Sequence, residues 1–191
     1  MDKRDAIVDA ACTTLASAGF GRITVGGVAK AARVSTALVH YHFATKGKLL
    51  AAAAETLARH RTDGRVAALA TEGGLSGLDA LWDVVAADRA AERTAPDLLL
   101  LAREDRDVRS ALGRERRREQ TRVAAALPGL LAALGTRPRL PLDELATTVC
   151  TFLDGAVASL LAGTPADDVR ASYDVFWLAL VGLGQGAPPA G

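Results

Sequence analysis

The chain has 191 residues, half of them apolar, with 4% aromatic residues and a formal net charge of +1. That apolar share is ample for the core of one domain or two small ones, and the dominance of alanine and leucine is typical of helical proteins. A net charge this close to zero excludes a generic binder of polyanions. The charge is uneven, however, because residues 1–48 carry seven Lys or Arg against three Asp. A basic N-terminal segment is the electrostatic pattern of a domain that faces DNA.

The first predicted helix covers residues 3–18 and ends at Gly19. Its apolar residues recur at helical spacing and define one face, made of Ile7, Val8, Ala11, Leu15 and Ala18. Glycine suits the end of a helix because it adopts the left-handed conformation without a steric penalty. Phe20 is expected to fill the small core between this helix and the next two.

Residues 23–46 contain the signals for two short helices and the start of a longer one. Thr24, Ser35 and Thr45 each precede apolar residues at helical spacing, which marks them as N-caps of three successive helices. A short turn around Arg33 separates the first two helices. This arrangement is a helix-turn-helix unit, and its second helix, residues 36–43, is predicted to enter the major groove of DNA.

The predicted recognition helix carries small and polar side chains suited to reading DNA. Thr36 and His40 are expected at base edges, and Ala37 against a thymine methyl group. Tyr41 and His42 are expected on phosphate or base. Further DNA contacts are expected from Thr24, Ser35, Thr45 and Lys46. Lys46 is expected to contact a phosphate group. Taken singly, each side chain has the alternative of being solvated or packed in the core.

Roughly the first 48 residues resemble the DNA-binding domain of the TetR family of bacterial regulators. The resemblance is carried by Ile23-Thr24-Val25, Val28-Ala29, Ala32, Val34-Ser35, Leu38-Val39, Tyr41-His42-Phe43, Lys46 and Leu49-Leu50. It implies a homodimeric regulator with a three-helix DNA-binding domain and a C-terminal helical domain that dimerises and binds a small ligand. The departures from the family pattern are Arg33 in place of a turn glycine, Gly26-Gly27 in place of an Arg-acidic pair, and His40 in place of Tyr.

The rest of the chain is also predicted to be helical, which gives an all-α protein with about nine helices and no strand. A long helix after Thr45 would run to about residue 70 and bridge the two parts of the molecule. Further helices are expected at about 77–93, 96–104, 107–127, 142–162 and 165–183. Ser76 would cap the first of these, and Pro128 would kink or end the third. Four consecutive leucines, residues 98–101, predict that the helix around them is buried on all sides.

These elements divide the chain into a DNA-binding domain at residues 1–48, a helical ligand-binding and dimerisation domain at residues 49–183, and a flexible tail at residues 184–191. The tail is rich in Gly, Pro and Ala, so we expect it to be disordered. The start of the sequence does not resemble a signal peptide, and no apolar run reaches about 18 residues. The protein is therefore expected to be cytoplasmic and without a membrane span.

No motif of the common enzyme or nucleotide-binding classes is present, so the sequence predicts no catalytic residue and no cofactor. His40 and His42 lie two positions apart and point to different sides of a helix, which makes them a poor pair for a metal ion. Cys12 and Cys150 fall within amphipathic helical patterns. Buried, reduced thiols are the expected state, and a redox pair is the alternative.

The ligand site is expected among the helices of the C-terminal domain, as the resemblance implies. The candidates are apolar side chains and one cationic anchor, namely Leu57, Trp82, Val85, Leu98, Leu101, Phe152, Leu153 and Arg103. Glu104 and Asp105 are alternative anchors, and each apolar candidate has a role in the core as its alternative. The low aromatic content favours an aliphatic effector of modest size over a flat cationic drug. The arginines between residues 114 and 122 are interpreted as a solvated face with i,i+4 pairs, with an anion or DNA site as the alternative.

The last two predicted helices carry regular apolar stripes with large aromatic side chains, which favours a homodimer built on them. The expected interface residues are Val149, Leu153, Ala156, Val157, Leu160, Tyr173, Phe176, Trp177 and Leu180. A two-fold dimer predicts a palindromic operator, while the alternative is that both helices close the core of the monomer. The expected function is a repressor that a small-molecule effector releases from DNA. The alternatives are an activator, a ligand-independent regulator, or a helical interaction module without an operator.

Overall fold

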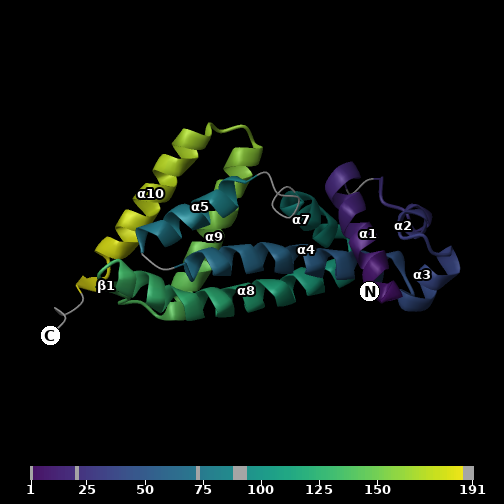
Figure 1. The fold of residues 1–191 in the computed structure, drawn as a ribbon, viewed down its shortest axis with the longest axis horizontal. Coiled ribbons are helices and arrows are strands. Elements are labelled where there is room, and N and C mark those ends of the chain that lie inside the picture. The colour runs from purple at the N-terminus through teal and green to yellow at the C-terminus, as the bar shows by residue number, and fades with distance from the viewer. Residues whose placement is uncertain (1, 20–21, 72–73, 88–93, 187–191) are drawn as a thin grey trace. The chain divides into compact units, whose positions relative to one another are not determined.

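The computed structural model describes residues 2–19, 22–71, 74–87 and 94–186, and it confirms an all-α fold (Figure 1). The described residues contain nine helices: α1 (Lys3–Ala18), α2 (Val25–Ala31), α3 (Thr36–His42), α4 (Lys46–Leu69), α5 (Leu75–Ala86), α7 (Ala95–Glu104), α8 (Arg106–Ala133), α9 (Leu142–Leu161) and α10 (Ala166–Gly182). Two short strands, β1 (Thr136–Arg137) and β2 (Gln185–Gly186), complete the described elements.

The chain folds into two compact units, each made of two separate stretches. Unit 1 comprises residues 1–61 and 88–116, and unit 2 comprises residues 62–87 and 117–191. Helices α4 and α8 each contribute residues to both units, and each unit has a hydrophobic cluster of its own. The predicted domains are each one continuous stretch of the chain, so their limits differ from those of the two units. The predicted limits remain a prediction.

In unit 1, α1 packs against α2 and α3 through the apolar face predicted from its sequence. Ile7 and Ala11 are fully buried, and Val8 and Leu15 are nearly so. Because burying a large aliphatic side chain stabilises a fold by about 1.5–3 kcal/mol, this face holds the three helices together. The Ala18 side chain and Phe20, which were also predicted to belong to this core, lie outside the described part of the chain.

In unit 2, the hydrophobic cluster is centred on α9, and α5, α10 and the C-terminal parts of α4 and α8 add residues to it. Tyr173 of α10 is fully buried within this cluster. Its hydroxyl donates a hydrogen bond of 2.7 Å to the carbonyl oxygen of Leu78 in α5. The bond satisfies a polar group that would otherwise be buried without a partner, and it fixes α10 against α5.

Unit 2 also buries a charge. The Arg65 side chain has no exposed surface, and its Nη1 donates to Glu119 Oε1 at 3.1 Å and to Asp154 Oδ1 at 2.8 Å. These residues belong to α4, α8 and α9, so one guanidinium group links three helices. A buried charge is stable only when it is paired and hydrogen-bonded, which makes each partner necessary to the others.

Helix α7 is half-buried, so the prediction that its leucines are covered on all sides was wrong. Leu98 and Leu101 are buried, whereas Leu99 and Leu100 are 66% and 55% exposed. Only residues three or four apart share a face of a helix. A single packed face therefore covers two of the four leucines and leaves the other two outside.

Two of the predicted helix ends were wrong. Helix α5 is capped by Gly74 and not by Ser76, and Gly74 has a φ of +58°. A Cβ atom at Gly74 would lie 2.9 Å from the carbonyl oxygen of Ala133, so both the backbone and the space require glycine. Helix α8 continues through Pro128 to Ala133. Pro128 is exposed, and it removes one backbone donor from the helix without ending it.

The predicted absence of strands was also wrong, although the sheet is very small. Thr136 pairs with Gly186, and Arg137 with Gln185, in an antiparallel ladder. A Cβ atom at Gly184 would collide with Thr136 Oγ1, so the chain approaches β1 closely at a glycine. Residues 185–186, which were assigned to the flexible tail, are therefore hydrogen-bonded, and residues 187–191 lie outside the described part.

Helix α9 is long and apolar enough to cross a membrane by length and composition alone, which the sequence analysis did not expect. A core helix of a globular unit meets the same criteria. Seven of its residues are buried: Leu145, Ala146, Val149, Cys150, Leu153, Ala156 and Val157. This packing accounts for the apolar composition of α9.

Candidate nucleic-acid interface

The three predicted N-caps are confirmed, and they set the positions of the helices around the turn. Thr24 Oγ1 accepts a hydrogen bond of 3.0 Å from the Gly27 N–H, which starts α2. Ser35 Oγ accepts one of 3.1 Å from the Leu38 N–H, which starts α3. Thr45 Oγ1 does the same for the Lys48 N–H at 3.1 Å, at the start of α4. Each cap satisfies one of the backbone donors that the first turn of a helix leaves without a partner.

The turn between α2 and α3 depends on one residue in the left-handed conformation. Arg33 has a φ of +55°, and it is the one non-glycine residue with positive φ in the described part of the chain. The Val34 N–H donates to the Ala29 carbonyl oxygen at 3.0 Å and so closes the end of α2. An L-residue in this conformation costs about 1–2 kcal/mol, which a glycine at this position would avoid. Arg33 thus stands where the family pattern described above has a glycine.

Helix α3 has one buried and one exposed face. Val39 is 1% exposed and belongs to the unit 1 cluster, where it anchors the helix. The opposite face carries four of the predicted DNA-contact residues, all exposed and within a sector of one helical face: Thr36, Ala37, His40 and Tyr41. The Tyr41 side chain is 82% exposed. An exposed tyrosine between small and polar neighbours is available for contact with phosphate or base.

His42 lies apart from this exposed face. It is half-buried, and its ring packs edge-on against Tyr41 with the ring centroids 5.3 Å apart. A second contact joins it to the ring of Phe43, at a centroid distance of 6.4 Å. The structure therefore places His42 beside the predicted DNA-facing set, where it supports the position of Tyr41.

The first turn of α4 adds two more exposed candidates, Thr45 and Lys46. The next residue, Gly47, was not singled out in the sequence analysis, although its neighbourhood is restricted. A Cβ atom at Gly47 would lie 2.5 Å from Asp105 Oδ2. The same carboxylate accepts hydrogen bonds from the Asp107 and Val108 N–H groups, at 2.8 and 3.1 Å, and so caps α8. Asp105, considered earlier as a ligand anchor, has a structural role at this point.

The positive charge of the N-terminal segment lies at the surface. All seven Lys and Arg residues of positions 1–48 are exposed: Lys3, Arg4, Arg22, Lys30, Arg33, Lys46 and Lys48. Arg4 also lies over the Phe43 ring, with its guanidinium carbon 5.4 Å from the ring centroid. Exposed cations attract phosphate groups and release counterions from DNA, which supports an interface for nucleic acid on this segment.

The predicted ligand-binding residues fall in both units. Leu57, Leu98 and Leu101 belong to the hydrophobic cluster of unit 1. Trp82, Val85, Phe152 and Leu153 belong to or pack against the cluster of unit 2, and Arg103 is exposed. The apolar candidates are thus distributed over two separate cores.

The predicted dimer-interface residues are mostly inside the core of the monomer. Six of them are buried in unit 2: Val149, Leu153, Ala156, Val157, Tyr173 and Trp177. Leu160, Phe176 and Leu180 are half-buried against the same cluster. The same two helices expose other apolar residues, including Val175 at 65% and Leu178 at 72%.

The arginine-rich stretch of α8 is exposed at most of its arginines, as predicted, but its two acidic residues are not solvated. Its two glutamates, Glu115 and Glu119, are buried, at 3% and 1% exposed. The exposed Arg114 pairs with Glu55 of α4 at 3.5 Å, and Arg122 pairs with Asp63 of α4. Ion pairs therefore connect α8 to α4 and do not run along α8 alone.

Comparisons with known proteins agree with this geometry. Residues 7–53 match the family model for bacterial regulatory proteins of the tetR family. A TetR-family transcriptional regulator from Rhodococcus sp. is similar in structure, with a TM-score of 0.78, 22% identity, and coverage of 94% of this chain and 98% of that chain. A second regulator, from Rhodococcus sp. RHA1, has a TM-score of 0.79 at 17% identity, with 94% and 95% covered. No curated protein matches the sequence.

A third similar structure is a transcriptional regulator from Saccharomonospora viridis in complex with choline. Its TM-score is 0.69 at 20% identity, with 91% of this chain and 94% of that chain covered. These identities are low, so the structural matches establish the fold, while the match at residues 7–53 establishes the type of DNA-binding domain. TetR-family regulators bind DNA operators and small-molecule effectors, typically as dimers, and they are not enzymes. Residues 7–53 therefore form a DNA-binding domain of the tetR-family type, and the chain has a fold similar to that of TetR-family transcriptional regulators.

Proposed function

We propose that this protein is a sequence-specific repressor that leaves its operator when a small-molecule effector binds. The observation that carries the proposal is the exposed face of α3, with Thr36, Ala37, His40 and Tyr41 on a helix whose opposite face is buried. In this function Thr36 and His40 read base edges, and Ala37 packs against a thymine methyl group. Such a regulator works where the genome is, in the cytoplasm.

The remaining candidates position the protein on the phosphate backbone. Tyr41 is exposed enough to reach a phosphate or a base, and His42 supports it through ring contact. Lys46 lies in the first turn of α4, where a helix N-terminus already favours an anion. Thr24, Ser35 and Thr45 use their hydroxyl oxygens as cap acceptors, so their O–H groups can donate to phosphate.

We also propose that two copies associate through the outward faces of α9 and α10. On α9 one row of exposed residues is small and recurs at helical spacing: Thr148, Thr151, Gly155 and Ala158. On α10 the exposed face carries apolar residues, among them Val175 and Gly182. Small residues allow close approach of helices, and burial of the apolar ones supplies the driving force. The interface would therefore use the side of these helices opposite to the residues predicted from sequence, and the operator would be a palindrome.

The effector acts by linkage. The effector must have a higher affinity for the conformation that is unable to bind DNA than for the conformation that binds it. Equal affinity for the two conformations would not change their populations. Helices α4 and α8 each run through both units, so a change in unit 2 has a covalent path to unit 1. The similar structure with choline supports a small organic molecule as the class of effector.

Selection from randomised DNA duplexes tests the proposal. We expect a palindromic consensus for the wild-type protein and a changed preference at one position of each half-site for His40→Ala. Lys46→Ala should weaken binding to all sequences and lower the salt slope by about one per half-site, because one phosphate contact is lost. Arg139→Ala, an exposed cation in unit 2, is the matched control and should leave the slope unchanged. Recovery of no consensus would contradict sequence-specific binding.

A further inference from the structure

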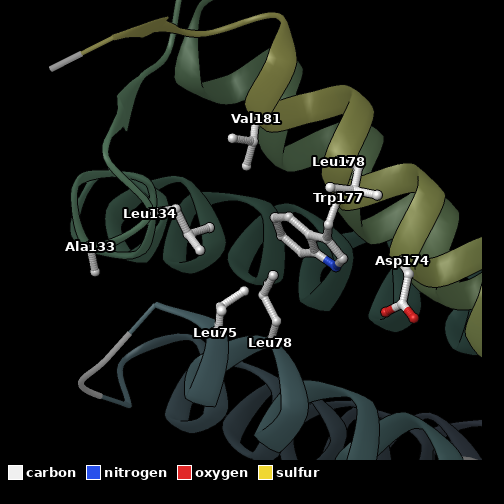
Figure 2. Close-up of a pocket in the computed structure, with 8 residues that line it drawn as sticks. All are labelled: Leu75, Leu78, Ala133, Leu134, Asp174, Trp177, Leu178 and Val181. Carbon is white, nitrogen blue, oxygen red and sulfur yellow. The ribbon is translucent and has the colours of Figure 1, made fainter.

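Unit 2 contains a groove that the predicted function does not use. It has a volume of about 590 Å³ and lies among α5, the C-terminal end of α8, and α10 (Figure 2). Its lining consists of Leu75, Leu78, Ala133, Leu134, Asp174, Trp177, Leu178 and Val181. None of these residues was among the sequence-predicted ligand candidates. The volume falls within the range of about 300–1,000 Å³ typical of small-molecule sites.

The walls of the groove are apolar and partly open to water. Leu75 of α5 is 69% exposed and Leu178 of α10 is 72% exposed, although both line the same groove. Trp177 supplies the central wall, as Figure 2 shows, and it is only 2% exposed. Its ring is held by Tyr173 and Phe176, at centroid distances of 6.1 and 5.4 Å. The aromatic wall is therefore fixed by the core before any ligand arrives.

One end of the groove carries charge. Asp174 is the one charged residue in the lining, and Figure 2 shows its carboxylate at the end opposite to Ala133 and Leu134. Its Oδ1 accepts a hydrogen bond of 2.9 Å from Arg170 Nε, and Arg170 Nη2 donates to Asp79 Oδ1 at 2.6 Å. Two carboxylates thus share one guanidinium group, and the local charge is −1. Asp174 Oδ2 makes no hydrogen bond to the described residues.

We propose that this groove binds an amphiphilic monocation, with an aliphatic body along the leucines and an ammonium head group beside Asp174. The negative end of the groove selects a cation, because Asp174 is the one charged residue of the lining. Leu75, Leu178 and Val181 gain stability when an apolar body removes them from water. That this molecule is also the effector rests on the proposed function, while the binding itself does not.

Calorimetric titration of the full chain with octyltrimethylammonium tests the site, with octanoate as the anionic probe of equal chain length. We expect one cation per chain and at least tenfold weaker binding of octanoate, because it meets Asp174 with a like charge. Leu178→Asn should weaken binding of the cation about tenfold, as expected for the loss of one buried leucine contact. Leu99→Asn is the matched control, since Leu99 of α7 is 66% exposed but does not line the groove. Asp174→Asn should weaken cation binding about fivefold, and Asp167→Asn should not.

Equal binding of octanoate, equal losses in the Leu178 and Leu99 variants, or no binding by the wild type would overturn the site. Sedimentation distinguishes a small-molecule site in the groove from a contact with a second copy of the protein. If Leu178→Asn converts a dimer to a monomer while Leu99→Asn does not, a second copy occupies the groove and the proposal fails. A DNA-binding assay with and without the cation tests the effector role by itself. Binding in the groove without loss of DNA affinity keeps the site and removes only its regulatory role.

Discussion

The exposed face of α3 and the groove beside α10 are both surfaces of well-packed helices, yet they differ in chemistry. The face of α3 shows small and polar side chains to water, while Val39 and Phe43 are buried behind them. The groove shows Leu75 and Leu178 to water, in front of the buried Trp177. A polar face is stable in water between binding events, whereas exposed leucines gain stability whenever something covers them. The first surface is therefore suited to reversible contact with a charged polymer, and the second to an apolar occupant.

The two units also differ inside, in the opposite sense. The hydrophobic cluster of unit 1 is aliphatic apart from Phe43, although Glu115 is also buried in this unit, while unit 2 holds the buried Arg65 paired with two carboxylates. Apolar packing tolerates small adjustments, but a buried charge depends on every partner. Disturbing each unit at a chosen residue should show whether this contrast holds.

The largest effect is expected at Arg65. Replacing it with Met removes the cation that the buried Glu119 shares with Asp154 and should lower the free energy of unfolding by about 3–5 kcal/mol. The control is Arg170→Met, because the pairs of Arg170 with Asp79 and Asp174 lie at the surface and should contribute less than about 1 kcal/mol. Denaturant titrations of both variants measure the difference. Equal losses would contradict the view that unit 2 depends on its buried charge.

A second expectation concerns Cys12 in unit 1. Burial, followed by the charge of Asp9, raises the pKa of the Cys12 thiol from its usual value near 9 to about 12. The thiolate is the reactive form, so Cys12 should react with a thiol reagent at pH 8 at least about a hundredfold more slowly in the folded protein than in denaturant. Reaction at the denatured rate would show that this part of unit 1 opens freely.

The raised pKa of Cys12 also predicts how the stability of the folded protein changes with pH. Between about pH 9 and pH 12 the Cys12 thiol is protonated in the folded protein and ionised in the unfolded protein. The contribution of Cys12 to the free energy of unfolding is therefore complete below about pH 9 and is lost as the pH rises toward 12. Stability of the wild type should therefore fall more steeply across this range than that of Cys12→Ala. Parallel curves for the two proteins would show that Cys12 does not contribute.

The smallest effect is expected at the N-cap of α3. Ser35→Ala removes the acceptor for the Leu38 N–H and should lower stability by about 1 kcal/mol. Ser76→Ala is the control, because Ser76 resembled a cap in the sequence but lies within α5. It should change stability by less than about 0.5 kcal/mol. Thermal unfolding of the two variants under the same conditions decides between them.

What the sequence predicted well is local. Thr24, Ser35 and Thr45 act as caps within three residues of their donors, so neighbouring positions suffice to identify them. The turn at Arg33 and the buried face of α1 follow from the same short-range rules. The helix-turn-helix and its exposed candidates therefore emerge from residue types and spacing alone.

The features that could not be predicted from the sequence depend on contacts between distant segments of the chain. An amphipathic stripe shows that one face of a helix is covered, but not whether the monomer or a partner covers it. For this reason the apolar residues of α9 and α10 were assigned to a dimer interface, whereas Val149 and Tyr173 are buried in unit 2. The groove likewise combines residues of three helices that lie far apart in sequence. The glycine at position 74, which caps α5, is required by the Ala133 carbonyl group, which leaves no space for a side chain.

The contact between Gly47 and Asp105 limits the order in which substitutions can accumulate at the start of α4. A side chain at Gly47 would meet Asp105 Oδ2, and that carboxylate cannot swing away without releasing the Asp107 and Val108 N–H groups. A mutation at Gly47 is therefore harmful in this background but becomes tolerable once Asp105 has been replaced by a smaller residue. The two positions are coupled by epistasis, so new variants of the DNA-facing turn would arise in descent only after a change at a site about sixty residues further along the chain.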